Sequence, residues 1–123
     1  ESNTKVEQNV IVYSPTSPGG SYKKYVALLT QTGTNAPIAT VFENTIGAIV
    51  WTRNSAGSYL GTLIEAFSVK TTITMGTSRV VVGIFLYSWR NSVNVVEIGT
   101  YDTSSIGVDG ILDQTLVEIK VYQ

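Results

Sequence analysis

Short apolar runs alternate with turn-forming residues along the chain, and most of the apolar residues are β-branched or aromatic. This pattern is typical of strands separated by turns. Successive side chains of a strand point to opposite faces, so alternation indicates a strand with one buried face. The runs that we interpret as strands span residues 6–13, 22–31, 38–44, 48–54, 58–63, 68–75, 80–89, 95–101 and 114–122.

Residues 22–31, YKKYVALLTQ, fit either a helix or a strand. A helix would place Tyr22, Tyr25, Val26 and Leu29 on one face. Ser21 could cap that helix. A strand would instead alternate, with Tyr25, Ala27 and Leu29 on one face. We favour the strand, because the exit TQTGTNAP is a poor helix end and nearly all the rest of the chain has strand character.

The most apolar run is VVVGIFLYSW, residues 80–89. It is apolar on both faces of the strand that it would form. Strands covered on both sides have this character, so the run predicts a central strand.

The pattern as a whole predicts an all-β protein with about eight or nine short strands, because turn signals recur every 8 to 12 residues or so. We expect a single-domain antiparallel β-sandwich, jelly-roll-like, over residues 1–123, with a closed β-barrel as the alternative. Residues 1–21 form a candidate extended N-terminal arm and loop, since SPTSPGGS at 14–21 is the clearest loop sequence.

The composition argues against several classes of function. The chain has no histidine and no cysteine, which excludes the usual general base, thiol nucleophiles, disulfides and thiolate zinc sites. Charged residues make up only 14 % of the chain, the net charge is −1, and no basic run exceeds Lys23-Lys24, so binding to nucleic acid is not expected. No apolar run approaches the roughly 20 residues of a membrane helix. We therefore expect no catalytic residues, no cofactor, no metal and no membrane partner.

The stretch IVWTRNSAGSYLGTL, residues 49–63, carries the first candidate contact residues, Trp51, Arg53 and Tyr59. As a binding site they would form an aromatic platform for sugar rings, with Arg53 donating to hydroxyls. As structure they would form a cross-strand pair, with Gly61 leaving room for the indole of Trp51 and Arg53 at the rim of the sheet. We favour the structural interpretation.

Trp89 and Arg90 are the second candidate pair, at the end of the most apolar run. Tryptophan and arginine are enriched among interface anchors, so the pair could contact a ligand or another subunit. The alternative, which we favour for Trp89, is a plug that closes the end of the sandwich.

The nine carboxylates show no pattern of catalysis. A glycosidase would need two of them facing each other across a cleft, and no sequence feature pairs any two. Three aspartates, Asp102, Asp109 and Asp113, line or flank one loop, where oxygen ligands can hold calcium. Their spacing matches no EF-hand, so we interpret them as turn formers.

Four motifs follow one another in the first half of the chain. They are Y-x-x-Y-x-A-L-L-T-Q-x-G-T-x-A-P at Tyr22–Pro37, E-N-T-(I/L)-G at Glu43–Gly47, V-W-T-R at Val50–Arg53 and G-x-Y-x-G-T-L at Gly57–Leu63. In this order they resemble small β-rich proteins of unknown activity from bacteriophage and prophage structural-gene regions. The resemblance covers about a third of the chain and brings no catalytic residues with it. It implies a non-enzymatic role in or on a viral particle.

These observations lead to one expected function and one alternative. The expected function is a structural or interaction protein of a phage or phage-derived virion, located in the virion or otherwise outside cells. Its partners would be further copies of itself or other virion proteins. The alternative is a carbohydrate-binding module that holds a surface glycan on an aromatic face.

Overall fold

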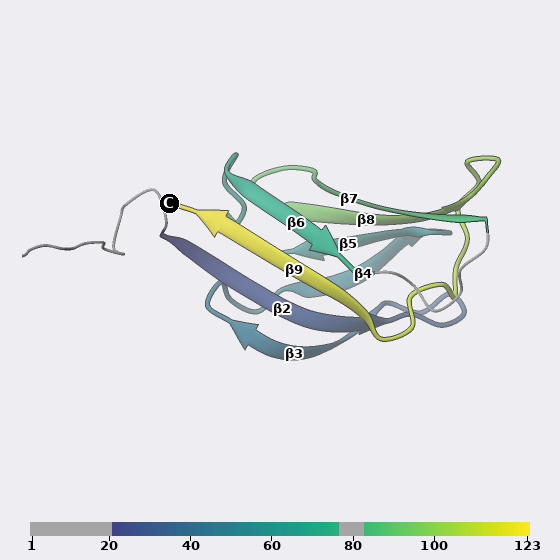
Figure 1. The fold of residues 1–123 in the computed structure, drawn as a ribbon, viewed down its shortest axis with the longest axis horizontal. Coiled ribbons are helices and arrows are strands. Elements are labelled where there is room, and N and C mark those ends of the chain that lie inside the picture. The colour runs from purple at the N-terminus through teal and green to yellow at the C-terminus, as the bar shows by residue number, and fades with distance from the viewer. Residues whose placement is uncertain (1–20, 77–82) are drawn as a thin grey trace, which may run out of the picture.

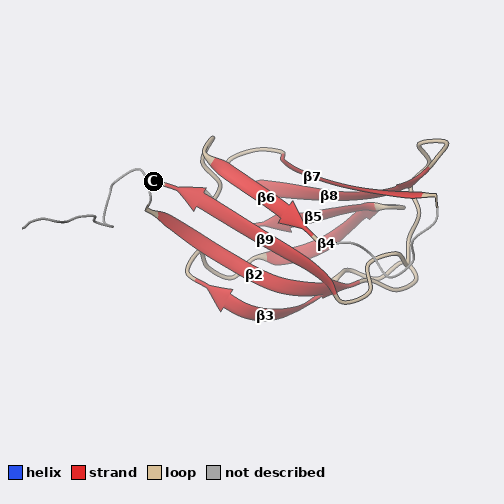
Figure 2. Ribbon diagram, viewed as in Figure 1, coloured by secondary structure: helices blue, strands red, loops and turns tan. Residues whose placement is uncertain are grey.

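The computed structural model describes residues 21–76 and 83–123, which form eight antiparallel strands (Figures 1 and 2). None of these residues belongs to a helix that could cross a membrane. The strands are β2 (Tyr22–Thr30), β3 (Ile38–Asn44), β4 (Val50–Ser55), β5 (Ser58–Thr62), β6 (Thr71–Met75), β7 (Ile84–Arg90), β8 (Val95–Asp102) and β9 (Thr115–Tyr122). The predicted strand at 6–13 and nearly all of the predicted loop at 14–21 lie outside the described residues.

The strands form two four-stranded sheets, in the orders β3-β2-β9-β6 and β4-β5-β8-β7. The sheets lie face to face as two layers, and β6 and β7 are neighbours along one side of them (Figure 1). The predicted all-β antiparallel sandwich is confirmed, and the alternative of a closed barrel is wrong.

Residues 22–30 form strand β2, so the strand interpretation of this ambiguous stretch is confirmed and the helix alternative is wrong. Tyr25, Ala27 and Leu29 point into the core and are at most 1 % exposed. β2 pairs with β3 on one side and β9 on the other. Those two ladders provide hydrogen-bond partners for the backbone of β2, as expected of an internal strand. A helix would not place these alternate apolar residues on one buried face.

The prediction of a central strand at residues 80–89 is wrong for the part that the structure describes. β7, residues 84–90, is the outermost strand of its sheet, and only β8 pairs with it. Leu86 packs against the core, whereas Phe85, Tyr87 and Trp89 are 39–49 % exposed. Aromatic side chains on the outer face thus produced the same apolar string that two buried faces would produce.

Strand β3 is the outermost strand at the opposite side of the other sheet, next to β2 alone. Most of its residues are exposed, including Ile38 at 72 % and Phe42 at 59 %. A bulge between Val26 and Ala27 interrupts its pairing with β2. The inner face of the sandwich is therefore built mainly by the other strands.

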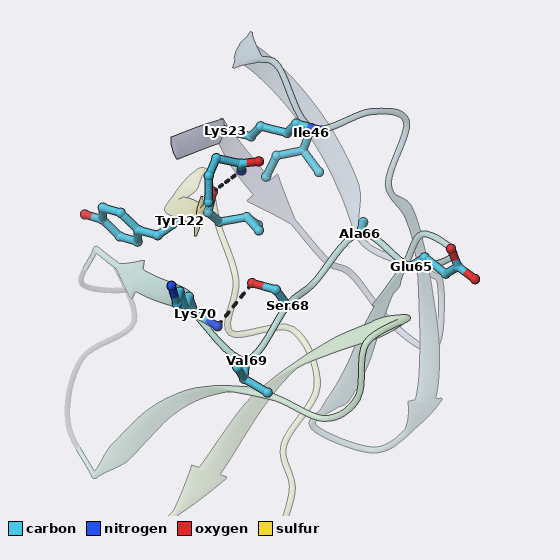
Figure 3. A pocket seen from close by; sticks show the side chains of 10 residues that line it. Lys23, Ile46, Glu65, Ala66, Ser68, Val69, Lys70 and Tyr122 are labelled. Atoms are coloured by element: carbon cyan, nitrogen blue, oxygen red, sulfur yellow. Dashed lines mark hydrogen bonds between the residues drawn. The ribbon is translucent and has the colours of Figure 1, made fainter. Parts of the chain in front are cut away.

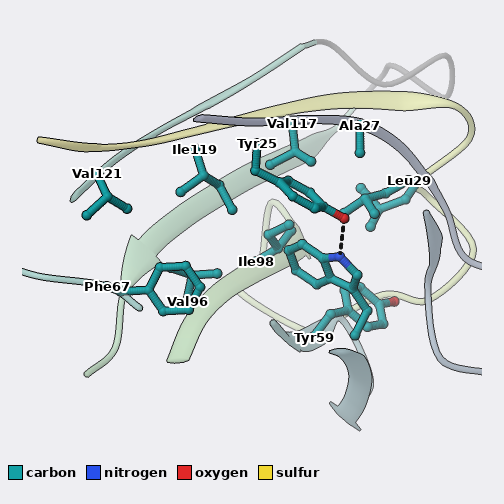
Figure 4. Close-up of a cluster of buried hydrophobic side chains, with 12 residues drawn as sticks. Tyr25, Ala27, Leu29, Tyr59, Phe67, Val96, Ile98, Val117, Ile119 and Val121 are labelled. Atoms are coloured by element: carbon teal, nitrogen blue, oxygen red, sulfur yellow. Dashed lines mark hydrogen bonds between the residues drawn. The ribbon is translucent and has the colours of Figure 1, made fainter. Parts of the chain in front are cut away.

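The core lies between the sheets and consists of alternate residues from β2, β9, β5 and β8, together with Trp51 of β4, Phe67 of the β5–β6 connection and Leu112 of the loop before β9 (Figure 4). Burial of each large apolar side chain contributes roughly 1.5–3 kcal/mol. Two aromatic side chains meet across the core, where Trp51 Nε1 donates a hydrogen bond of 3.1 Å to the hydroxyl of Tyr25. The polar tips of both rings are thereby satisfied where water has no access.

The structure confirms the predicted role of Gly61 beside Trp51. The two residues are direct partners in the β4–β5 register. A Cβ atom at Gly61 would lie 2.9 Å from Cζ3 and Cη2 of the indole, closer than ordinary contacts allow. The missing side chain is what lets the indole lie flat on β5.

We expect Gly61→Ala to lower the free energy of unfolding by about 1–3 kcal/mol, because the added methyl group overpacks the core against the indole. Equilibrium urea unfolding followed by far-UV circular dichroism measures the change. In the double variant with Trp51→Phe, the smaller ring should accept the methyl group, so the two losses should not add. Strict additivity would contradict this account of the contact.

Candidate functional site

The structure brings two of the first candidates together, but inside the protein. Trp51 is 7 % exposed and Tyr59 is fully buried, which agrees with the structural interpretation. Neither ring is available to a ligand at the surface, so these two residues do not form the platform that a sugar-binding interpretation requires. Arg53 alone of this group retains partial exposure, with 25 % of its side chain accessible.

Arg53 is engaged by Asp109, 56 residues further along the chain. Arg53 Nη2 lies 2.8 Å from Asp109 Oδ2, and Arg53 Nε lies 3.2 Å from the same oxygen. The other carboxylate oxygen accepts a hydrogen bond of 2.7 Å from the Tyr59 hydroxyl and one of 3.1 Å from the amide of Gly57. The carboxylate therefore ties the β4–β5 hairpin to the loop before β9.

Gln31 extends this network to the end of β2. Its Oε1 lies 2.9 Å from the Tyr59 hydroxyl and accepts a hydrogen bond of 2.7 Å from the amide of Gly110. Its Nε2 donates hydrogen bonds to the carbonyls of Gly33 and Asn35. Three loops are thus held by the buried side chains of Gln31 and Tyr59 and by Asp109, whose side chain is 18 % exposed. Such a network fixes the end of the sandwich in one arrangement.

Charge and hydrogen bonding perturb the ionisation of this cluster strongly. Hydrogen bonds from Arg53, then from Tyr59 and the Gly57 amide, lower the pKa of Asp109 to about 2, against the opposing effect of burial. Burial and the hydrogen bond to Asp109 raise the pKa of the Tyr59 hydroxyl above its usual range. At neutral pH the cluster holds one anion, one cation and one neutral phenol. Its groups are satisfied by one another, so we assign it a structural role.

Asp102, a second aspartate of this loop, acts as a turn former. Asp102 Oδ1 accepts hydrogen bonds from the amides of Ser104 and Ile106, at 2.8 and 3.0 Å. This is the side-chain-to-backbone pattern for which aspartate is favoured in turns. Among the described residues, no group of three or more carboxylates has the arrangement of a metal site.

The second candidate pair separates into two different environments. Arg90 Nε donates a hydrogen bond of 2.8 Å to the carbonyl of Phe67 and so anchors the β5–β6 connection. Trp89 is 39 % exposed on the outer face of β7, and the interpretation of this residue as a plug of the sandwich end is wrong. Consecutive residues of β7 lie on opposite faces of the sheet, and Trp89 lies on the outer face with Phe85 and Tyr87.

Trp89 belongs to a row of exposed aromatic side chains. Phe85, Tyr87 and Trp89 alternate along β7, and Tyr101 of β8 pairs directly with Phe85. The ring centroids of Phe85 and Tyr87 lie 6.2 Å apart, and those of Tyr87 and Tyr101 lie 5.8 Å apart. We call these four residues the aromatic face.

Gly99 shapes this face in the way that Gly61 shapes the core. A Cβ atom at Gly99, the β8 partner of Tyr87, would come within 2.4 Å of Cε2 of Tyr101. The ring of Tyr101 therefore lies down over the backbone of β8 beside Tyr87.

Sequence reasoning included Trp89 but missed its three neighbours on the aromatic face. The signal was present in part, because Phe85, Tyr87 and Trp89 occupy every second position of one run. Tyr101 could not be added without the register of β7 and β8, which places it opposite Phe85.

A separate hollow of 370 Å³ lies at the end of the sandwich near Tyr122 (Figure 3). It is lined by Lys23, Ile46, Glu65, Ala66, Ser68, Val69, Lys70, Val121, Tyr122 and Gln123. The hydrogen bonds drawn there are local ones, from the Lys70 amide to Ser68 Oγ and from Gln123 Nε2 to the Val121 carbonyl. They close turns of the chain and leave no convergent polar cluster that would define a ligand.

Comparison with known proteins adds nothing to this geometry: no family model, no curated protein and no solved structure matches the chain. The choice of the aromatic face as the best candidate site therefore depends on the exposure and chemistry of its own residues.

We expect Asp109→Asn to destabilise the fold at pH 7 and to matter progressively less in acid. The pKa of Asp109 is lower in the folded chain than its ordinary value of 3.8. Its ionised form therefore stabilises the fold above that ordinary value, and the contribution is lost as the pH falls from about 4 towards 2. Urea unfolding at pH 7, 4 and 2.5 measures the difference between wild type and variant.

The control for this experiment is Asp102→Asn, which keeps the side-chain oxygen that accepts the two turn amides. Its effect should be small at each pH. A penalty for Asp109→Asn that stays constant from pH 7 to 2.5 would contradict the assignment of a stabilising ion pair.

The two tryptophans should report on opposite faces of the same sheet. Trp89→Phe leaves Trp51 as the sole tryptophan, and we expect its emission to be blue-shifted and weakly quenched by acrylamide because the indole is buried. Trp51→Phe should leave the strongly quenched emission of Trp89. Strong quenching in the Trp89→Phe variant would show that Trp51 is not in the core.

Proposed function

We propose that this chain is a non-enzymatic interaction domain that contacts its partner through the aromatic face. The observation that carries the proposal is the exposure of Phe85, Tyr87 and Trp89, at 48, 49 and 39 %, in one row along strand β7. Exposed apolar groups gathered in one patch are typical of binding surfaces, whereas single exposed ones are not informative. Aromatic residues supply large contact areas at little cost in side-chain entropy, which suits them to this use.

The composition supports a role in contact over one in catalysis. The chain has neither imidazole nor thiol, and Asp109, whose pKa is the most strongly shifted among the carboxylates of the described residues, is paired with Arg53. The edge strand β7 and its internal neighbour β8 present the aromatic face from a continuous ladder of seven residue pairs. A site on such a ladder is held in a fixed arrangement before a partner binds, which lowers the entropy lost on binding.

The setting that we propose for this domain is a phage or phage-derived particle. Support comes from the resemblance carried by residues 22–63 and from a chain in which only 14 % of residues are charged. The partner would be another virion protein, a further copy of the chain or, as the alternative, a surface glycan. The carboxylate of Glu97, beside Trp89 on the aromatic face, favours the glycan alternative.

The test is to produce particles from the genes that flank this one, with the chain expressed as wild type or as Phe85→Ser/Tyr87→Ser. We expect the wild-type chain to co-sediment with purified particles on a density gradient and the double variant to remain largely unbound. The exposed variant Phe42→Ser on β3 is the matched control and should sediment like wild type. Absence of the wild-type chain from purified particles would contradict the particle setting, and equal recovery of the double variant would contradict the role of the aromatic face.

A further inference from the structure

A carboxylate stands directly beside the aromatic face. Glu97 of β8 is the register partner of Trp89, so both side chains lie on the outer face of the sheet. Its Oε2 accepts a hydrogen bond of 2.9 Å from Ser58 Oγ, and its Oε1 accepts one of 2.9 Å from Asn91 Nδ2. A hydroxyl and an amide from two other segments therefore hold the carboxylate in a fixed position next to the aromatic row.

This polar group retains capacity for a ligand. A carboxylate offers about four acceptor positions, of which the contacts to Ser58 and Asn91 use two. Asn91 has a second amide hydrogen and a carbonyl oxygen, and Asn54 reaches the same cluster through a 3.3 Å hydrogen bond from Nδ2 to Ser58 Oγ. Donors and acceptors are thus presented together along one side of the rings.

The charge on this face favours one class of partner. Among the strand residues that the register places on the outer face of β4-β5-β8-β7, Glu97 is the one member of the Asp, Glu, Lys and Arg types. A protein partner that covered Trp89 would also remove water from this carboxylate, which is costly without a cation to pair with it. A second copy in a symmetric contact would bring a second negative charge. The hydroxyl groups of a sugar, by contrast, can donate to the carboxylate as water does.

We propose that the aromatic face, with Glu97, Asn91 and Asn54 at its side, binds a neutral pyranose glycan. The proposal rests on the proposed function, in which the aromatic face is the contact surface. Sugar rings carry a face of C–H groups with partial positive charge, and the faces of aromatic rings are negative, so the two stack favourably. From Phe85 to Trp89 the strand extends about 13 Å, which suits a glycan of more than one sugar unit. Glu97 repels acidic sugars, so uncharged chains are the ones accepted.

The experiment uses the whole 123-residue chain on an array of neutral oligosaccharides built from glucose, mannose, galactose and N-acetylglucosamine, with sialylated chains as the acidic comparison. Isothermal titration calorimetry then measures the affinity of the chain for the neutral glycan that binds best on the array. We expect neutral glycans to be bound in preference to sialylated ones. Bound glycan should also protect the fluorescence of Trp89 from acrylamide while the emission of Trp51 stays unchanged.

The variants separate a binding site from a structural role. Tyr87→Ala and Trp89→Ala should each weaken binding about tenfold or more, with far-UV circular dichroism and unfolding midpoints near those of wild type. Glu97→Gln should also weaken binding of neutral glycans and should reduce the discrimination against sialylated ones. Phe42→Ala, an exposed aromatic substitution on the other sheet, should bind as wild type does.

Failure of this inference can be told from failure of the proposed function. If no neutral glycan on the array binds, or if binding survives Tyr87→Ala and Trp89→Ala unchanged, the glycan inference is overturned. In that case dependence of particle association on Phe85 and Tyr87 would still support an interaction domain whose partner is a protein. If neither glycan nor particle association depends on these rings, both proposals are wrong.

Discussion

Two sheets without a disulfide between them are held together by the burial of their inner faces, and the arrangement of the other parts depends on that contact. The chain has no cysteine, so packing and hydrogen bonds must fix one sheet against the other. Two polar contacts help to fix the sheets against each other. Trp51 donates a hydrogen bond to the Tyr25 hydroxyl, and the Tyr59 hydroxyl lies within hydrogen-bond distance of Gln31. In both cases the partners come from different sheets or from the end of one, so sliding of the layers would leave buried polar groups unsatisfied.

Because the inner faces provide the stability, the outer face of β4-β5-β8-β7 is available for contact. The same device shapes both sides of this sheet: Gly61 makes room for Trp51 within the core, and Gly99 makes room for Tyr101 on the aromatic face. The first ring is buried and the second contributes to an accessible surface. Neighbouring strands of one sheet thus serve stability and recognition with alternate residues.

Most of the strands could be predicted from the sequence, because period-two alternation and turn residues are local signals. The position of a strand within its sheet could not, since it depends on which strands become neighbours. The apolar run at 80–89 predicts a central strand, whereas β7 lies at the edge of its sheet. Likewise, the Arg53–Asp109 pair joins residues 56 positions apart, and no spacing rule reveals it. The row of Phe85, Tyr87 and Trp89 was readable in principle, but the direction in which it faces was not.

The outermost position of β3 has a consequence for handling and packing of the protein. This strand carries Ile38, Val41 and Phe42 at the surface, and its one charge, Glu43, is engaged by Lys24 at 3.3 Å. Natural sheets protect their borders with lysine, proline or a covering segment, since unprotected borders recruit further chains in a growing ladder. Strand β3 contains neither lysine nor proline. At high protein concentration we therefore expect chains to associate along the edge of β3, which is not the edge that carries the aromatic face.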